Sequence, residues 1–275
     1  MEIREHGAFQ ALHAGLKVKM IATQREHFKT CRLNENLRSV ANRNEDKFDF
    51  MPVLQGGDGS DHIVGIVQLD GYFETAAPDK LVSEVLHPLH ETYLIGADAS
   101  ILSFVIEADT RPFRLLVSDQ GVIGLVSLSD LQKLPVRAAL FGLVTALEMA
   151  MTDAIRTCDP KGERWPAYIS ALRKDELASR IEKARLKGEL VDELLFTEFC
   201  EKRDILKKLN PANITEQRPA DFERKLKRIE EVRNKLAHAN DYAASRKKAA
   251  EVCVTVRILL DMHKRISSAA QSQNP

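Results

Sequence analysis

The sequence predicts two fused parts of different fold class: an α+β domain over residues 1–134 and an all-α helical bundle over residues 135–275. The first part contains a weak strand–turn–strand repeat, and the second contains long segments with apolar residues three and four apart. The two parts also differ in charge. Residues 1–134 hold 13 Lys plus Arg against 19 Asp plus Glu, and residues 135–275 hold 27 against 21, although the whole chain is formally neutral. Each part is long enough to bury its own core.

The repeat lies in the first part of the chain. Its first copy is a predicted strand over 50–54, a turn, and a second strand over 63–69, rich in β-branched residues. Its second copy has predicted strands over 112–117 and 122–128. A short helix precedes each copy, over 36–43 and 100–107. Two similar units in one domain indicate a fold built by duplication.

The end of the second copy reads Gly124-Leu-Val-Ser127-Leu-Ser-Asp130. A serine hydroxyl can contact phosphate, and a carboxylate can accept two hydroxyl donors. A helix that begins near Asp130 would offer free backbone amides to an anion. The first copy has Gln68 and Gly71 at the corresponding places. An ordinary strand end and helix N-cap explains Ser127 and Asp130 equally well.

Residues 17–134 resemble a pair of CBS motifs, the Bateman module. The resemblance implies a regulatory adenine nucleotide (AMP, ADP, ATP or a related molecule), with Ser127 at its phosphate and Asp130 at its ribose. It places doubt on a second nucleotide site in the first copy, because Gln68 and Gly71 depart from the family pattern.

The second part predicts a bundle of helices. The first covers 136–156, directly after Pro135, a residue common at helix starts. Further helices are expected over 169–186, 190–209, from 221 through the motif below, and over 243–266, with a disordered tail after Ser267. Glu148 lies among apolar residues of the first helix, either on an exposed flank or paired with Arg233 or His238.

The stretch Arg233-Asn-Lys-Leu-Ala-His238 carries the chemistry of this part. Arg233 falls on the apolar stripe of its helix, where a guanidinium that cannot deprotonate suggests a specific contact. Asn234 and His238 are four apart and are expected to be neighbours on the adjacent face. RNA cleavage without a metal needs a base for the 2′-hydroxyl, a cation for the phosphoryl oxygens and an acid for the leaving oxygen. His and Arg can supply these roles.

This stretch resembles the R-x4-6-H motif of HEPN domains, all-α modules found in many prokaryotic ribonucleases and toxins. The resemblance covers about 136–268 and implies a homodimer in which two motifs form one composite site. It also implies catalytic roles for Arg233, Asn234, His238 and Glu148, with no cofactor for catalysis. RNA would be the substrate, with phosphate contacts expected from four residues one to three turns before the motif: Arg224, Lys225, Lys227 and Arg228.

Two functions follow from these patterns. The first is a ligand-regulated endoribonuclease, a bacterial toxin or phage-defence effector that could have a cognate antitoxin. The second is a non-catalytic, nucleotide-responsive scaffold that docks a partner protein through an inactive HEPN bundle. In that case Arg233 would pair with Glu230 or with an acid on another helix, and His238 would simply cap the bundle.

The remaining signals concern the compartment of the protein. The cysteines are scattered without the spacing of a metal or redox site, at Cys31, Cys158, Cys200 and Cys253. We found no apolar run expected to span a membrane and no signal peptide. These patterns predict a cytoplasmic protein that neither binds a structural metal nor enters a membrane.

Overall fold

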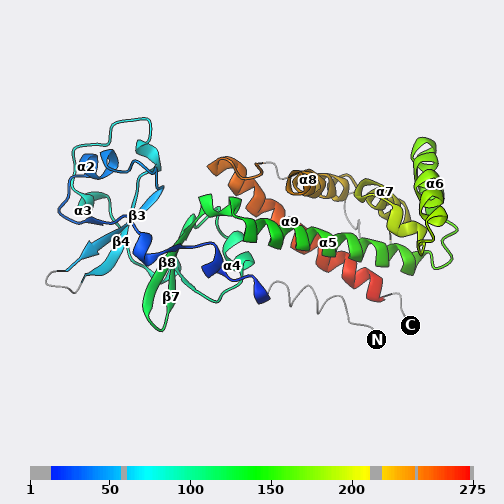
Figure 1. The fold of residues 1–275 in the computed structure, drawn as a ribbon, viewed down its shortest axis with the longest axis horizontal. Helices are drawn as coiled ribbons and strands as arrows, with labels where there is room; N and C mark the ends of the chain where they lie inside the picture. Colours follow the sequence, from blue (N-terminus) through cyan, green and yellow to red (C-terminus); the bar gives the residue numbers. More distant parts are fainter. Residues whose placement is uncertain (1–13, 57–60, 211–218, 239–240, 273–275) are drawn as a thin grey trace. The chain divides into compact units, whose positions relative to one another are not determined.

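The computed structural model describes residues 14–56, 61–210, 219–238 and 241–272. The chain divides into two compact units (Figure 1). One unit holds residues 13–136 and 245–250 and is called the repeat unit below. The other holds the described residues within 137–244 and 251–272 and is called the helical unit.

Two four-stranded sheets form the framework of the repeat unit. In one, the order β2-β3-β4-β5 joins four strands: β2 (Cys31–Arg32), β3 (Phe50–Gln55), β4 (His62–Gln68) and β5 (His87–Pro88). In the other, the order is β1-β8-β7-β6, from β1 (Thr23–Gln24), β8 (Gly121–Ser127), β7 (Phe113–Ser118) and β6 (Leu94–Gly96). Each sheet has one parallel pair, a central antiparallel hairpin and an antiparallel edge strand. The predicted hairpins are therefore confirmed.

Short helices complete each copy of the repeat. The predicted helices before the hairpins are α2 (Leu37–Asn42) and α4 (Ile101–Val105). Both begin where a side chain caps free amides: Asn36 accepts from the amides of residues 38 and 39, and Ser100 from that of residue 102. The remaining short helices are α3 (Val82–Val85) and the 3-10 turns η1 (Val18–Met20), η2 (Arg25–His27), η3 (Asp70–Tyr72), η4 (Glu91–Tyr93) and η5 (Leu128–Gln132).

The two copies match residue by residue. Both hairpins carry a register irregularity at the same place, between Val53 and Leu54 in one and between Leu116 and Val117 in the other. Twin residues also touch each other, because the Phe50 and Phe113 rings lie 4.7 Å apart between centroids. These rings belong to one buried cluster with residues of both copies. The weak repeat in the sequence is therefore a structural duplication.

Twin glycines explain how the edge strands approach the hairpins. A Cβ on Gly65 would lie 2.4 Å from the carbonyl oxygen of His87 on β5, and one on Gly124 would lie 3.1 Å from that of Thr23 on β1. A side chain at Gly65 would therefore push the edge strand away, and one at Gly124 would require a small shift. Each glycine precedes the stretch in which nucleotide contacts were expected.

The helical unit is built mainly from long helices: α5 (Leu134–Cys158), α6 (Ala171–Leu186), α7 (Phe199–Leu209), α8 (Pro219–Ala237) and α9 (Arg246–Ser272). Short turns η6 (Trp165–Tyr168) and η7 (Glu193–Phe196) connect α5, α6 and α7. α7 packs against α8, and α6 runs across the direction of α5 (Figure 1). The apolar stripe of α5 is buried, with Leu140, Leu143, Leu147 and Met151 at most 1% exposed. The prediction of a helical second part is confirmed.

Three predicted boundaries were wrong. The helix expected over 190–209 is split, because Asp192 caps η7 and Thr197 is extended, while Glu198 and Glu201 form a capping box that starts α7. The last helix starts later than predicted and continues past Ser267 to Ser272. The long first helix already includes Leu134 and Pro135, so only Lys133 separates it from η5.

One expectation about membranes also needs correction. Among the described residues, α5 is long and apolar enough to cross a membrane by length and composition. The sequence analysis missed this because charged residues at 137, 148, 153 and 156 divide the helix. More than half of its apolar window is buried inside the protein. A core helix of a folded bundle passes the same test, so the finding is weak support for a membrane span.

Candidate functional site

Arg233 and Glu148 are brought together from two helices of the helical unit. Arg233 lies on α8 and Glu148 on α5, and Arg233 Nε is 3.3 Å from Glu148 Oε1. The contact is an ion pair and not a hydrogen bond, although Glu148 Oε1 is fully buried. The Arg233 side chain stays 37% exposed, which leaves the guanidinium partly accessible to a ligand. Of the two readings of Glu148, the structure favours pairing.

Asn234 lies next to this ion pair. Its Oδ1 accepts a hydrogen bond of 3.2 Å from Nη1 of Arg233. Asn234 is itself exposed. The guanidinium is thus held at Nε by a carboxylate and at Nη1 by an amide. An anion would meet a cation whose orientation is already restricted, which lowers the entropy lost on binding.

His238 lies one residue past the end of α8, where it stays a neighbour of Asn234. The helix ends at Ala237 and His238 occupies the following turn. Its backbone amide still donates to the carbonyl of Asn234, at 3.1 Å. The residue is exposed. Arg233, Asn234 and His238 therefore lie within the last turn and a half of one helix end, with the imidazole open to solvent.

Arg137 holds this helix end from the side of α5. Its Nη1 donates to the carbonyl of Leu236, at 3.0 Å, and lies 3.4 Å from that of Lys235. Its guanidinium carbon lies 5.0 Å from the centroid of the Tyr242 ring. The last carbonyls of a helix lack intrahelical partners, and a cation there also interacts favourably with the helix dipole. Arg137 is not among the residues predicted from the sequence to be functional.

Lys202 is a second residue that the sequence analysis missed. It lies on α7, is 5% exposed, and donates from Nζ to the carbonyl of Thr197 at 2.5 Å. Burial lowers the pKa of its ammonium, and the neighbouring carboxylates of Glu148 and Glu201 raise it in part. A buried cation beside Glu148 gives that carboxylate a second positive neighbour besides Arg233.

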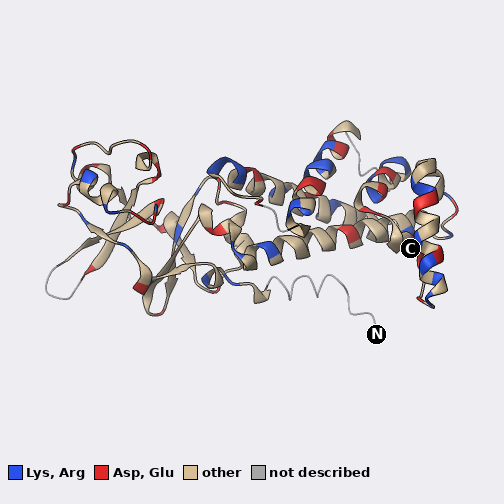
Figure 2. Cartoon of the chain, turned by 45° about the horizontal axis from the view of Figure 1, so that its top comes forward, with Lys and Arg blue, Asp and Glu red and all other residues tan. Residues whose placement is uncertain are grey.

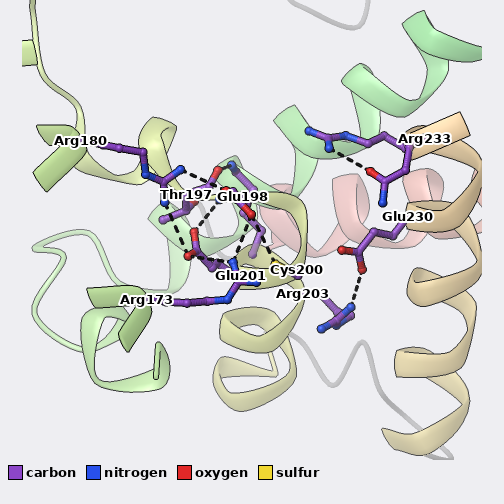
Figure 3. A network of polar contacts seen from close by, with 11 residues as sticks. Arg173, Arg180, Thr197, Glu198, Cys200, Glu201, Arg203, Glu230 and Arg233 are labelled. Carbon is purple, nitrogen blue, oxygen red and sulfur yellow. Dashed lines mark hydrogen bonds and ion pairs between the residues drawn. The ribbon is translucent and has the colours of Figure 1, made fainter. Parts of the chain in front are cut away.

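The surrounding polar contacts fix α7 between α6 and α8 (Figure 3). Arg203 on α7 pairs with Glu230 on α8, at 2.6 Å. Glu230 therefore pairs with Arg203 and not with Arg233, which was one of the alternatives left open by the sequence. Two arginines of α6, Arg173 and Arg180, each pair with two carboxylates at the start of α7, Glu198 and Glu201 (Figure 3).

The four residues expected to contact RNA phosphates lie on α8 with partners of their own. Arg224 and Lys225 pair with Asp221, and Lys227 pairs with Glu223. Arg228 donates to Thr255 Oγ1 and to the carbonyl of residue 251. Basic and acidic residues alternate along the helices of this unit (Figure 2). Arg224 stays the most accessible of the ion-paired three, at 80% exposed.

In the repeat unit, Ser127 and Asp130 form a buried capping box. The Ser127 amide donates to Asp130 Oδ2 at 2.6 Å, and Lys133 Nζ lies 2.7 Å from Asp130 Oδ1. Both Ser127 and Asp130 are 7% exposed. Burial raises the pKa of the Asp130 carboxyl, and Lys133 and Ser127 lower it in part. The N-cap explanation of these residues is therefore seen directly, and a ribose would have to displace Lys133 from the carboxylate.

The first copy has a different polar arrangement at the corresponding place. Gln68 donates from Nε2 to Asp70 Oδ1, at 2.7 Å, and Asp70 forms an ion pair with Arg246. Burial raises the pKa of the nearby Asp49 carboxyl, and Asp70 raises it further. Protein groups thus already satisfy the polar atoms where the first copy departs from the expected motif.

Within the described residues, no three His, Cys, Asp or Glu side chains gather in a group that could hold a metal ion. None of the four cysteines forms a disulfide. Burial raises the pKa of Cys31 to about 12, which keeps that thiol protonated and unreactive near neutral pH.

No protein-family model and no curated protein matches the chain. Similar solved structures include the CBS domain of a bacterial CNNM/CorC family Mg²⁺ transporter in complex with ATP, 20% identical, with a TM-score of 0.37, over 50% of this chain and 99% of that one. CBSX2 in complex with AMP is 17% identical, with a TM-score of 0.34, over 46% and 97%. A hemolysin-like CBS protein of Oenococcus oeni is 10% identical, with a TM-score of 0.34, over 46% and 93%.

At these low scores the similarity carries no argument about function. The repeat unit shows its duplication in three features: the matching strand order of the two sheets, the register irregularity in each hairpin and the Phe50–Phe113 contact. These features describe a symmetric pair of small α+β repeats.

Proposed function

We propose that this protein is a metal-independent endoribonuclease of the HEPN type, regulated by an adenine nucleotide through a CBS-type repeat unit. The observation that carries the proposal is the ion pair of Arg233 with Glu148 at a helix end that also presents Asn234 and His238. A fixed cation, an amide and an imidazole lie together on a surface open to a polymer. These are the groups that phosphodiester cleavage by a neighbouring hydroxyl requires.

Arg233 is the residue for charge stabilisation. As the 2′-oxygen bonds to phosphorus, negative charge grows on the non-bridging oxygens, and a guanidinium fork can contact two of them. Glu148 engages Nε, and Asn234 engages Nη1. Neither of these two contacts uses Nη2 of Arg233, so a phosphate oxygen could bind there. At Nη1 the phosphate would compete with the exposed Asn234.

His238 is the residue for proton transfer. In the reaction, a base removes the 2′-hydroxyl proton, the new oxygen–phosphorus bond forms, and the bond to the 5′-oxygen breaks while an acid protonates that oxygen. The products are a 2′,3′-cyclic phosphate and a free 5′-hydroxyl. One chain supplies one His at this helix end, so a second copy from a homodimer would provide the other proton-transfer group.

The basic residues of α8 are the proposed route for RNA. Among the basic residues of α8 that form ion pairs, Arg224 is the most exposed. An RNA phosphate would replace Asp221 as its partner. Exposed ion pairs are weak, at about 0–1 kcal/mol, so exchanging one carboxylate for a phosphate costs little. Lys225 and Lys227 would exchange their carboxylate partners in the same way, and Arg228 would exchange its contacts with Thr255 Oγ1 and the carbonyl of residue 251.

The repeat unit is the proposed sensor. Ser127 would contact the phosphate of an adenine nucleotide, and Asp130 its ribose hydroxyls after Lys133 has moved away. Asp130 is joined to the helical unit by a short covalent path, because η5 ends at Gln132 and α5 begins at Leu134. A protein of this kind would act in the cytoplasm as a toxin or antiviral defence effector, with a cognate antitoxin as a further partner.

A second candidate is a non-catalytic scaffold that docks a partner protein. It is favoured by the internal partners of the proposed ligand contacts. Lys133 pairs with Asp130, and carboxylates pair with three of the four predicted RNA contacts of α8, Arg224, Lys225 and Lys227. In a scaffold these ion pairs would be permanent parts of the fold.

Cleavage of RNA by the purified full-length protein separates the two candidates. We expect cleavage in excess EDTA, with a 2′,3′-cyclic phosphate and a 5′-hydroxyl at the new ends. A substrate with 2′-deoxyribose at the scissile position should stay intact. His238→Ala and Arg233→Ala should each lower the rate by about two to four orders of magnitude. Arg233→Lys should not restore it, because an ammonium lacks the bidentate fork.

Arg265→Gln is a matched control for the loss of an arginine. It lies on α9, pairs with Asp261 within its own helix and is half exposed. Its activity should equal that of the wild type. A 5′-phosphate at the product end, or loss of activity in EDTA, would replace the proposed mechanism. An inactive wild type whose helices are folded would favour the scaffold.

A further inference from the structure

The end of α8 is held on both sides of His238 by one residue of another helix. Arg137 on α5 donates to the carbonyl of Leu236, two residues before His238. The same guanidinium lies over the ring of Tyr242, four residues after it. Arg137 thus contacts the chain on either side of the turn in which the imidazole is placed.

Several features make this contact stronger than an ordinary surface contact. Tyr242 is 2% exposed, so the ring under Arg137 is a fixed part of the core. The Leu236 side chain is also buried, at 4%. A guanidinium that stacks on an aromatic face and donates to helix-terminal carbonyls uses both its π surface and its N–H groups. A lysine cannot reproduce both contacts with one compact ammonium.

The location of Arg137 in the sequence supports a dedicated role. It is the only charged residue between Leu134 and Leu147 of α5, a segment otherwise filled with apolar and small residues. A charged group in such a segment loses part of its hydration, and the free energy of that lost hydration is offset only where the protein supplies polar partners. The end of α8 and Tyr242 are among the partners supplied here, and both flank His238.

We infer that Arg137 is a positioning residue for His238, fixing the C-terminal end of α8 so that the imidazole stays in register with Arg233. This inference rests on the proposed ribonuclease function. Arg137 does not contact the reacting phosphate; it acts by holding the backbone that carries the proton-transfer group. Misplacement of a catalytic group by about 1 Å can lower a rate about a hundredfold, so such a role has a measurable effect.

The first test needs no activity. Hydrogen exchange of the His238 backbone amide is measured by NMR in the full-length protein, since this amide bonds to the Asn234 carbonyl at 3.1 Å. Arg137→Gln should raise its exchange rate about three- to tenfold, the scale of a lost cation at a helix C-terminus. Amides in the middle of α7 should keep their wild-type rates. Arg156→Gln is the matched control on the same helix, because Arg156 pairs with Asp153 and Asp192 away from α8.

The second test uses RNA cleavage. Arg137→Gln should lower kcat about ten- to a hundredfold with KM for RNA unchanged, and Arg137→Lys should recover only part of the loss. Arg156→Gln should leave kcat and KM at the wild-type values. Addition of a general base such as imidazole should restore more activity to His238→Ala than to Arg137→Gln, because only the first variant leaves space for it.

The outcomes distinguish this inference from the proposed function. Unchanged exchange at His238, or a rise spread evenly over α7 as well, would overturn the holding role of Arg137. Wild-type kcat in Arg137→Gln would overturn it as well, with the ribonuclease function intact. If the wild type does not cleave RNA but exchange rises only around His238, the ribonuclease function fails and the holding role stands.

Discussion

Arg233 Nε lies 3.3 Å from Glu148 Oε1, and this ion pair joins α8 to the middle of α5. The carboxylate oxygen is fully buried, whereas the arginine side chain stays more than one third exposed. Solvent screening limits such a half-exposed pair to about 0.5–1 kcal/mol of stability. Its effect on the orientation of the guanidinium is therefore more important than its effect on folding.

Glu148→Gln tests that orientation. Glutamine keeps the shape and removes the charge, so Arg233 stays in place but loses its fixed direction. We expect kcat for RNA cleavage to fall about tenfold, well short of the loss in His238→Ala, because the cation itself is retained. Asp153→Asn is the matched control on the same helix, where the acid pairs only with the surface residue Arg156. An equal fall in kcat in Glu148→Gln and Asp153→Asn would show that removing any carboxylate from α5 lowers activity, and would contradict a specific role for Glu148.

Assembly gives a second prediction. A single helix end supplies one His238, and a two-base reaction needs two proton-transfer groups. We expect light scattering to show a homodimer at micromolar concentration. A mixture of His238→Ala chains with Arg233→Ala chains should contain fewer intact sites than the wild-type dimer. A stable monomer with full nuclease activity would rule out the composite site.

Nucleotide binding depends on Asp130 in the proposed sensor. Asp130→Ala should weaken binding of AMP, ADP or ATP by about 1.5–3 kcal/mol, roughly ten- to a hundredfold, as two charge-assisted hydrogen bonds are lost. Gly71→Ala is the control at the twin position, where open space surrounds the added methyl group, and it should bind like the wild type. Calorimetry that detects no adenine nucleotide on the wild type would remove the sensor and leave the nuclease proposal unaffected.

The pH dependence of stability follows from the same carboxyl. Burial raises the folded-state pKa of Asp130 above its ordinary value of 3.8. Its contribution to the free energy of unfolding is therefore complete below pH 3.8 and is lost as pH rises through the folded pKa. Asp130→Asn mimics the protonated form, so its stability relative to the wild type should increase from pH 3 to pH 7. Urea unfolding at several pH values measures this difference, and parallel curves for the two proteins would contradict it.

The sequence was sufficient to predict the duplicated hairpins, because alternating apolar residues and turn residues are local signals. Both hairpins and the helices before them are confirmed. The split before α7 was missed, because Thr197 and Glu198 are compatible with a helix when read alone. The capping contacts of Asp192 and Glu201 decide otherwise.

The candidate site could be predicted only in part. The motif placed Arg233, Asn234 and His238 close together through local spacing. Glu148 was a candidate because an acid among apolar residues needs a partner. Lys202 could not be identified, since Glu-Lys-Arg on a helix normally indicates a solvated surface. Only its tertiary surroundings bury it, with charged groups of α5 and α8 close by. Arg137 had a signal in its apolar surroundings, but its partners are far away in the sequence.

The contact between Phe50 and Phe113 has a consequence for how the repeat unit folds. Each ring packs against its twin, so the cluster that the two copies share is complete only when both have formed, although residues 31–82 also contribute a buried cluster of their own. The two copies should therefore unfold in a single cooperative transition, and a cavity made in one should lower the melting temperature of both equally. A duplicated domain of this type couples the folding of its two halves through the one buried cluster to which both contribute.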